Sequence, residues 1–145
     1  MTKIRKTVLD LVTTSSVPLS AGTIYEQLVS QKRLKCNLAS VYRTLKYLEL
    51  EHLAGSFILH CEAHGTERYF YANKQLHTHW FHCSVCHRFF DIGNAVTKNN
   101  HCIIDKTAEA IQTLYGFSVE QHSLLFTGTC KDCIQSQKHN FILMQ

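Results

Sequence analysis

Two Cys-x-x-Cys pairs constrain this chain more than any other feature. The first pair is Cys83 and Cys86, and the second is Cys130 and Cys133. A pair on a tight turn directs two thiolates at one point, and two pairs complete the tetrahedral four-sulfur shell of a structural zinc. A disulfide or a redox dithiol is the alternative, because Cys-x-x-Cys also serves thiol chemistry. We predict a structural zinc site that joins the end of the chain to its middle, with a strand, a helix and a strand between the pairs.

Length and composition favour a globular protein with reduced thiols. The chain has 145 residues, 45% of them hydrophobic, which suffices for one ordinary domain or two small ones. It contains no long apolar run and does not open like a signal peptide, so we expect a cytoplasmic protein with no membrane partner. A reducing compartment favours thiolates over disulfides. Outside the two pairs, Cys36, Cys61 and Cys102 are expected to be small buried or half-buried residues.

Charge and histidine divide the chain into two parts. Residues 1–50 contain eight Lys or Arg against three acids, a net charge of +5, and no histidine. Residues 51–145 have a net charge of −1 and contain all ten histidines. A basic first third before a remainder rich in His and Cys suggests contact with a polyanion in one part and metal binding in the other. The excess of five charges is also compatible with a merely solvated face.

The first third predicts three helices. Apolar residues recur there at helical spacing in three stretches, and Ser20 and Asn37 are suitable N-caps for the second and third helices. The three apolar stripes are Ile4, Val8, Leu11 and Val12; Ile24, Tyr25 and Leu28; and Val41, Leu45 and Leu48. Residues 57–60 and 68–71, on either side of Gly65, are typical of a two-stranded wing.

This order of elements is that of a winged helix-turn-helix, in which the third helix would enter a DNA major groove. The face of that helix opposite its apolar stripe presents Ser40, Tyr42, Arg43 and Lys46 as candidate DNA contacts. Each has an alternative role. Tyr42 could pack on the wing, and Arg43 could pair with Glu49. The local positive charge favours contact of Arg43 and Lys46 with phosphate.

Histidines before the first Cys-x-x-Cys pair suggest a second metal site. His77 and His79 lie on one face of the expected strand, since side chains alternate along a strand with period two. Two imidazoles supply half of a metal shell. His122 precedes the second pair on the expected partner strand, and Asp105 begins a predicted helix from about residue 104 to 115 that Gly116 would end. Spacing alone does not select His122 and Asp105 as ligands.

These motifs together resemble the ferric uptake regulator family of metal-dependent bacterial repressors. The resemblance implies an α+β protein with a winged-helix DNA-binding domain at residues 1–73, and a metal-binding α/β dimerisation domain with the four-cysteine zinc at 74–145. It also implies a homodimer that binds a double-stranded operator under control of a regulatory metal. The matching segments are Thr2–Arg5, Leu19–Tyr25, Ala39–Leu45, His77–Cys86, His122–Leu124 and Gly128–Cys133.

Counted along the family pattern, His77, His79, Asp105 and His122 match the ligands of a site inside the dimerisation domain. The resemblance thus implies a regulatory site for a second divalent metal, Zn²⁺, Fe²⁺ or Mn²⁺. The family's inter-domain site looks dismantled, because Pro18, Tyr71, Thr78 and Trp80 stand at its ligand positions and only Asp91 is kept. A one-residue shift would instead give His77 and His79 to that site, with Asp91.

Two segments depart from the family pattern. Residues 94–102 form a longer segment than the family's, and its His101 or Cys102 could join either metal site. The chain also starts close to the T-x-x-R motif, without the basic helix that often precedes it, which bears on the usual DNA contact.

The predicted function is therefore a metal-responsive transcriptional repressor of metal-uptake or stress genes, with no catalytic residues and no small organic ligand. Peroxide sensing through the inter-domain site is an alternative within the family. A thiol oxidoreductase would need a reactive Cys at a helix N-terminus, whereas the first pair follows a predicted strand. A zinc hydrolase would need an open coordination position and a Glu base, and the sequence contains no H-E-x-x-H motif.

Overall fold

The computed structural model describes residues 1–73 and 78–145. The chain divides into two compact units, Met1–Gln75 and Leu76–Gln145, and each is described by itself. The predicted boundary after residue 73 falls at the edge of 74–77, which lie outside the described residues. None of the described helices is both long and apolar enough to span a membrane.

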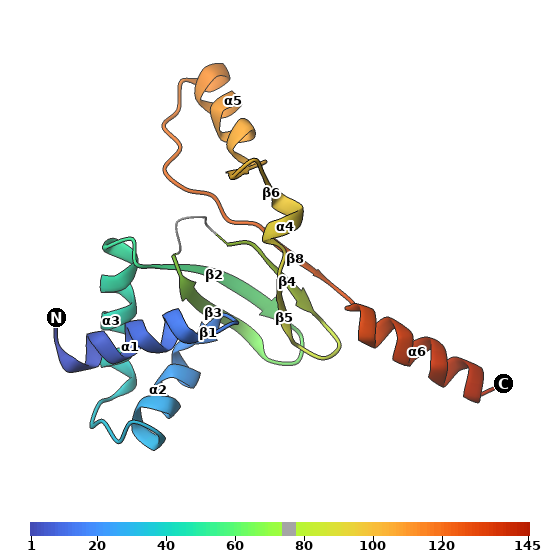
Figure 1. Cartoon of the computed structure of the whole chain (residues 1–145), viewed down its shortest axis with the longest axis horizontal. Coiled ribbons are helices and arrows are strands. Elements are labelled where there is room, and N and C mark those ends of the chain that lie inside the picture. Colours follow the sequence, from blue (N-terminus) through green and yellow to red (C-terminus); the bar gives the residue numbers. More distant parts are fainter. Residues whose placement is uncertain (74–77) are drawn as a thin grey trace. The chain divides into compact units, whose positions relative to one another are not determined.

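The N-terminal unit contains three helices and a three-stranded antiparallel sheet (Figure 1). The two long strands pair from Ala54 with Ala72 to Cys61 with Gly65, and the short first strand adds to the edge of β3. The predicted wing is therefore confirmed. The elements are α1 (Lys3–Thr14), β1 (Leu19–Ser20), α2 (Ala21–Ser30), α3 (Leu38–Leu50), β2 (Ala54–Cys61) and β3 (Gly65–Ala72).

Each of these helices begins at a side-chain cap. The hydroxyl of Ser20 accepts a hydrogen bond from the Thr23 amide at 3.1 Å, and Asn37 Oδ1 accepts one from the Ser40 amide at 2.8 Å. Thr2 caps α1 in the same way. A cap satisfies one amide that the first helical turn leaves unpaired. The two predicted caps, Ser20 and Asn37, are thus confirmed.

The predicted apolar stripes form the core of this unit. The innermost side chains lie on the facing sides of the three helices, and Phe70 of β3 covers them. Ile4, Leu11 and Tyr25 are only partly buried at the edge of the core. The fully buried helical residues are Val8, Val12, Ala21, Ile24, Leu28, Val41, Leu45 and Leu48.

The C-terminal unit contains a three-stranded sheet with strand order β5-β4-β8. The central strand β4 is antiparallel to β5 and parallel to β8. The strand–helix–strand arrangement predicted between the two cysteine pairs is present, with a short hairpin in addition (Figure 1). The elements are β4 (Trp80–Cys83), β5 (Phe89–Asp91), α4 (Gly93–Val96), β6 (Thr97–Lys98), β7 (His101–Cys102), α5 (Asp105–Tyr115), β8 (Leu125–Gly128) and α6 (Lys131–Leu143).

Two helices of this unit bury none of their residues. Helix α5 ends as predicted at Gly116, whose φ of 68° is in the left-handed region that glycine adopts without strain. Helix α6 was not predicted. The large apolar side chains that these helices and their flanks expose are Leu114, Tyr115, Phe117, Ile134, Phe141, Ile142, Leu143 and Met144. The described part of the chain therefore leaves an apolar surface uncovered here.

Truncating a buried leucine of α3 should destabilise the N-terminal unit strongly. Leu48 is fully buried, whereas Leu50 on the same helix is 69% exposed. We expect Leu48→Ala to lower the free energy of unfolding by about 2–5 kcal/mol, because it leaves a cavity. Leu50→Ala should change it by less than about 0.5 kcal/mol. Urea titration followed by circular dichroism measures both, and equal losses would show that α3 packs differently.

Candidate metal centres

The register between β4 and β8 brings the two cysteine pairs together. Cys83 at the end of β4 pairs with Gly128 of the parallel strand β8. Cys130, the first residue of the second pair, follows Gly128 by two residues. Parallel strands end at the same edge of a sheet, and both turns therefore lie at one edge. The ligand atoms of Cys83, Cys86, Cys130 and Cys133 all lie within 4.8 Å of one another.

The spacing of these sulfurs fits a tetrahedral zinc. Cys86 Sγ lies 3.8 Å from Cys130 Sγ. Zn–S bonds of about 2.3 Å at tetrahedral angles place two sulfurs about 3.8 Å apart. A disulfide would require about 2.05 Å, and all seven cysteines are free thiols. This separation suits two ligands of one metal ion and differs from that of an oxidised pair.

Backbone amides stabilise one thiolate of the cluster. The amides of Cys130 and Cys86 donate to Cys83 Sγ at 3.3 and 3.5 Å. Burial acts against the charged form, but these donors together lower the pKa of Cys83 to about 6. Burial raises the pKa of Cys133 to about 12 in the absence of a cation. Four thiolates in one cluster therefore need a cation, which is the condition a structural zinc satisfies.

Arg88 bridges the two cysteine turns. Its Nε donates to Cys86 Sγ at 3.2 Å, and its Nη2 lies 3.7 Å from Cys130 Sγ and 3.0 Å from Asp132 Oδ2. The hydrogen bond from Arg88 lowers the pKa of Cys86. The Arg88–Asp132 ion pair is exposed and contributes little stability by itself. Its effect is to hold a guanidinium against two sulfurs, which offsets part of their negative charge.

A second group of metal-ligating atoms lies in the same unit. His79 Nε2 is 3.2 Å from Cys102 Sγ, Cys102 Sγ is 3.4 Å from His122 Nε2, and the two imidazole nitrogens are 3.3 Å apart. The imidazole rings stack with centroids 5.2 Å apart. His79 is 3% exposed and Cys102 is 7% exposed. Three donor atoms thus converge, two of them on buried residues and the third on the half-buried His122.

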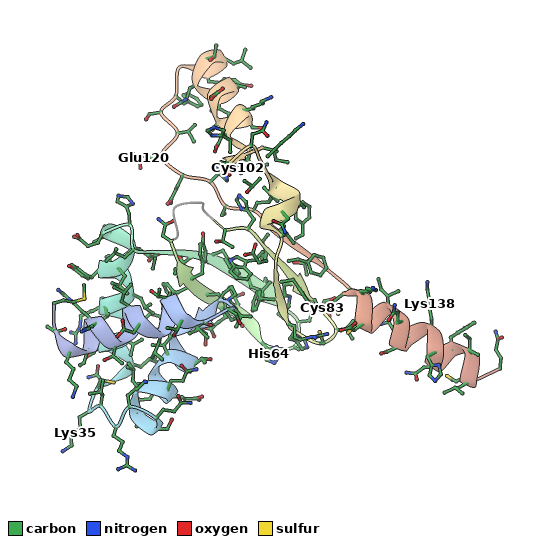
Figure 2. All side chains as sticks on the ribbon, in the orientation of Figure 1. Lys35, His64, Cys83, Cys102, Glu120 and Lys138 are labelled. Carbon is green, nitrogen blue, oxygen red and sulfur yellow. The ribbon has the colours of Figure 1, made fainter. Side chains whose placement is uncertain are left out.

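A tight hairpin carries Cys102 to the two histidines. Strands β6 and β7 pair Thr97 with Cys102 and are joined by Asn99 and Asn100, whose φ values of 51° and 62° are both left-handed. Two-residue hairpin turns of this kind favour asparagine. Figure 2 labels Cys102 on this hairpin, just before α5.

The histidines sit slightly outside the strands in which we predicted them. His79 immediately precedes β4, and its carbonyl accepts from the Ile92 amide at 3.1 Å. His122 lies before β8, which begins only at Leu125. The expectation that His122 belongs to the partner strand is therefore wrong by three residues, although its side chain does meet His79.

The other predicted ligands, His77, Asp105, His101 and Asp91, do not belong to this group of donor atoms in the described residues. His77 lies outside the described residues. Asp105 is the half-buried first residue of α5 and is not among the grouped donor atoms. His101 is exposed, because neighbours on a strand face opposite sides and Cys102 points inward. The exposed Asp91 accepts a hydrogen bond from the Gly93 amide at 2.7 Å. All four stay predictions as metal ligands.

Cys102 contacts both histidines, a contact to which the resemblance assigned no residue. Two signals in the sequence bear on it: the long segment 94–102, and a cysteine outside the two pairs. Neither specifies a partner, since the contact with His79 spans 23 residues and depends on the hairpin.

The predicted DNA-contacting residues lie on α3. Tyr42 is 46% exposed, and Arg43 and Lys46 are exposed as well. Ser40 donates to Asn37 Oδ1 at 2.8 Å and accepts from Arg43 Nη2 at 3.2 Å, so its hydroxyl orients the arginine. Glu49 accepts a hydrogen bond from Ser56, a partner other than the Arg43 considered above. The basic side chains of α3 are therefore accessible to a polyanion.

Comparison with known proteins agrees with this fold. The sequence profile described as the ferric uptake regulator family matches residues 1–127. The chain belongs to the ferric uptake regulator family. It is a metal-responsive transcriptional regulator with a four-cysteine site, and the family is one of regulators and not of enzymes. No curated protein sequence matches the chain.

Solved structures of the family share the fold at low sequence identity. The ferric uptake regulator of Francisella tularensis with iron has a TM-score of 0.66 and 20% identity, covering 92% of this chain and 93% of that one. The Helicobacter pylori ferric uptake regulator has a TM-score of 0.64 and 20% identity, and the match covers 92% of this chain and 81% of that one. A zinc uptake regulator in complex with zinc and DNA has a TM-score of 0.62 and 18% identity, and the match covers 94% of this chain and 85% of that one.

Removing the guanidinium beside the sulfurs should make the four-cysteine cluster release zinc faster. We expect Arg88→Gln to raise the release rate by roughly tenfold to a hundredfold, the range typical of changes next to metal ligands. The matched control is Lys131→Gln, which removes one exposed positive charge next to Cys130. Transfer of zinc to a coloured chelator measures the rate. Equal rates in Arg88→Gln and wild type would exclude this role.

Proposed function

We propose that this regulator is a homodimeric, cytoplasmic repressor whose affinity for operator DNA depends on a divalent metal bound in its C-terminal unit. The observation that carries the proposal is the convergence of buried His79 and Cys102 with half-buried His122, in the unit that also contains the four-cysteine cluster. The four-cysteine cluster would stabilise the fold, and the cluster of His79, Cys102 and His122 would bind the metal that is sensed.

The four cysteines are proposed to bind zinc for structure. Their donor set, free thiols and 3.8 Å sulfur spacing support this assignment. Bound there, zinc would supply a cross-link between the end of β4 and the start of α6. Hydrogen bonds already join these turns, such as the one from the Ser84 amide to the Gly128 carbonyl at 2.8 Å.

The second cluster is proposed to be the regulatory site. His79, Cys102 and His122 come from three separate segments, the start of β4, the β6–β7 hairpin and the approach to β8. Holding one cation would fix these segments relative to each other. We further propose His77 and Asp105 as candidates for the remaining coordination position. The inter-domain alternative with Asp91 stays a prediction.

Dimerisation is proposed through the C-terminal unit. Helices α5 and α6 bury no residue, and exposed apolar side chains gather on them and their flanks. Exposed apolar side chains that gather in this way are typical of protein interfaces, and closed homodimers are the commonest assembly. A second copy would cover this surface and set the separation of two winged helices.

DNA contact is proposed for Ser40, Tyr42, Arg43 and Lys46 of α3. Their exposure, and the hydrogen bond that orients Arg43, support it. One structurally similar protein is a zinc uptake regulator in complex with DNA. Half-sites about one duplex turn apart accept only one spacing of recognition helices. A metal that fixes the dimer would therefore raise operator affinity through coupling between the two sites.

Replacing a histidine of the second cluster should remove metal-dependent DNA binding. We expect His122→Ala to lose most of the increase in affinity that zinc, Fe²⁺ or Mn²⁺ produces for a duplex selected from random-sequence DNA. The variant should keep one zinc per chain in the cysteine cluster. Fluorescence anisotropy and elemental analysis measure the two quantities.

The matched control is Gln121→Ala, which removes the exposed side chain next to His122. It should behave as wild type. If His122→Ala still shows the full metal-dependent increase in affinity, the proposed regulatory site is wrong. If no metal changes DNA affinity in the wild type, the proposed function itself is wrong.

A further inference from the structure

The most unusual feature of the second cluster is its sulfur. Cys102 is buried between two imidazole nitrogens at 3.2 and 3.4 Å. A buried cysteine that only fills space would be expected to have apolar neighbours. Here the sulfur contacts two metal-ligating nitrogens, which also lie 3.3 Å from each other.

The triangle formed by these atoms has the size of one face of a zinc tetrahedron. Zn–N bonds of about 2.0–2.1 Å place two nitrogens about 3.3 Å apart, and with a Zn–S bond of about 2.3 Å, nitrogen and sulfur lie about 3.6 Å apart. The observed N–N separation is 3.3 Å, and the two N–S separations are within a few tenths of an ångström of that geometry. A small movement would accommodate the ion.

Charge supports the same assignment. Two neutral imidazoles bring no negative charge to a buried cation, and an isolated charge in an interior position is costly. Cys102, bound as a thiolate, would supply one negative charge directly to the ion. Asp105 begins α5 three residues later, but it is not among the converging donor atoms.

We infer that Cys102 is a thiolate ligand of the regulatory metal and makes this site selective for zinc over Mn²⁺ and Fe²⁺. Thiolate favours zinc, whereas carboxylate suits harder ions such as Mn²⁺. This inference rests on the proposed regulatory site and names the metal that the site senses.

Cobalt titration tests the ligand directly. The probe is Co²⁺ added to the full-length protein that keeps one zinc per chain, as elemental analysis confirms during the titration. A near-ultraviolet thiolate-to-cobalt charge-transfer band should appear in the wild type and in Cys36→Ser. It should be absent from Cys102→Ser. The control Cys36 is a half-buried thiol of the N-terminal unit.

Selectivity is tested with Cys102→Asp, which replaces sulfur with a carboxylate. We expect the ratio of zinc affinity to Mn²⁺ affinity to fall at least about tenfold, since even changes next to a ligand cost tenfold to a hundredfold. Competition with a fluorescent chelator measures both affinities. Anisotropy of the selected duplex should show Mn²⁺ promoting DNA binding better in this variant than in the wild type.

Two results would overturn the inference. One is cobalt bound at the second site of the wild type without a thiolate band. The other is an unchanged zinc-to-manganese ratio in Cys102→Asp. Either result leaves the proposed function standing if metal still raises DNA affinity and His122→Ala still abolishes that effect. The wild-type spectrum decides the ligand even if a Cys102 variant fails to fold.

Discussion

The convergence of four cysteine sulfurs at one edge of a small sheet is the constraint on which the C-terminal unit depends. The sheet has only three short strands. Helix α5, which follows the separate β6–β7 hairpin, and helix α6, which follows β8, bury none of their residues. A unit of this size has little apolar core with which to hold itself together. Pairing of Cys83 with Gly128 in the parallel register brings the two cysteine turns together. A cation bound by both turns would stabilise that register.

The second cluster depends on the first. His79 precedes the strand that ends at Cys83, and His122 precedes the strand that leads to Cys130. Fixing the C-terminal ends of β4 and β8 at the cysteine cluster therefore limits where their N-terminal ends, next to the two histidines, can lie. Cys102 then reaches both histidines from the hairpin. A site built from three such segments is well suited to sensing, because occupancy changes how they are held.

Sequence reasoning succeeded where the determinants are local. Ser20 and Asn37 could be assigned as caps, and Gly116 as a helix end, because each acts on residues within one turn. The cysteine cluster was predictable because two identical spacings leave few alternatives. Cys102 was considered as a ligand without an assigned site, since its contacts depend on a hairpin whose Asn99–Asn100 turn was not recognised. Helix α6 was missed for a related reason: it buries no apolar stripe that a periodicity would reveal.

Zinc K-edge X-ray absorption of protein carrying one zinc per chain tests the central claim most directly. The account predicts a shell of four sulfurs at about 2.3 Å. A shell dominated by nitrogen or oxygen would contradict it. So would a folded C-terminal unit that contains no zinc and has the two cysteine pairs joined as disulfides.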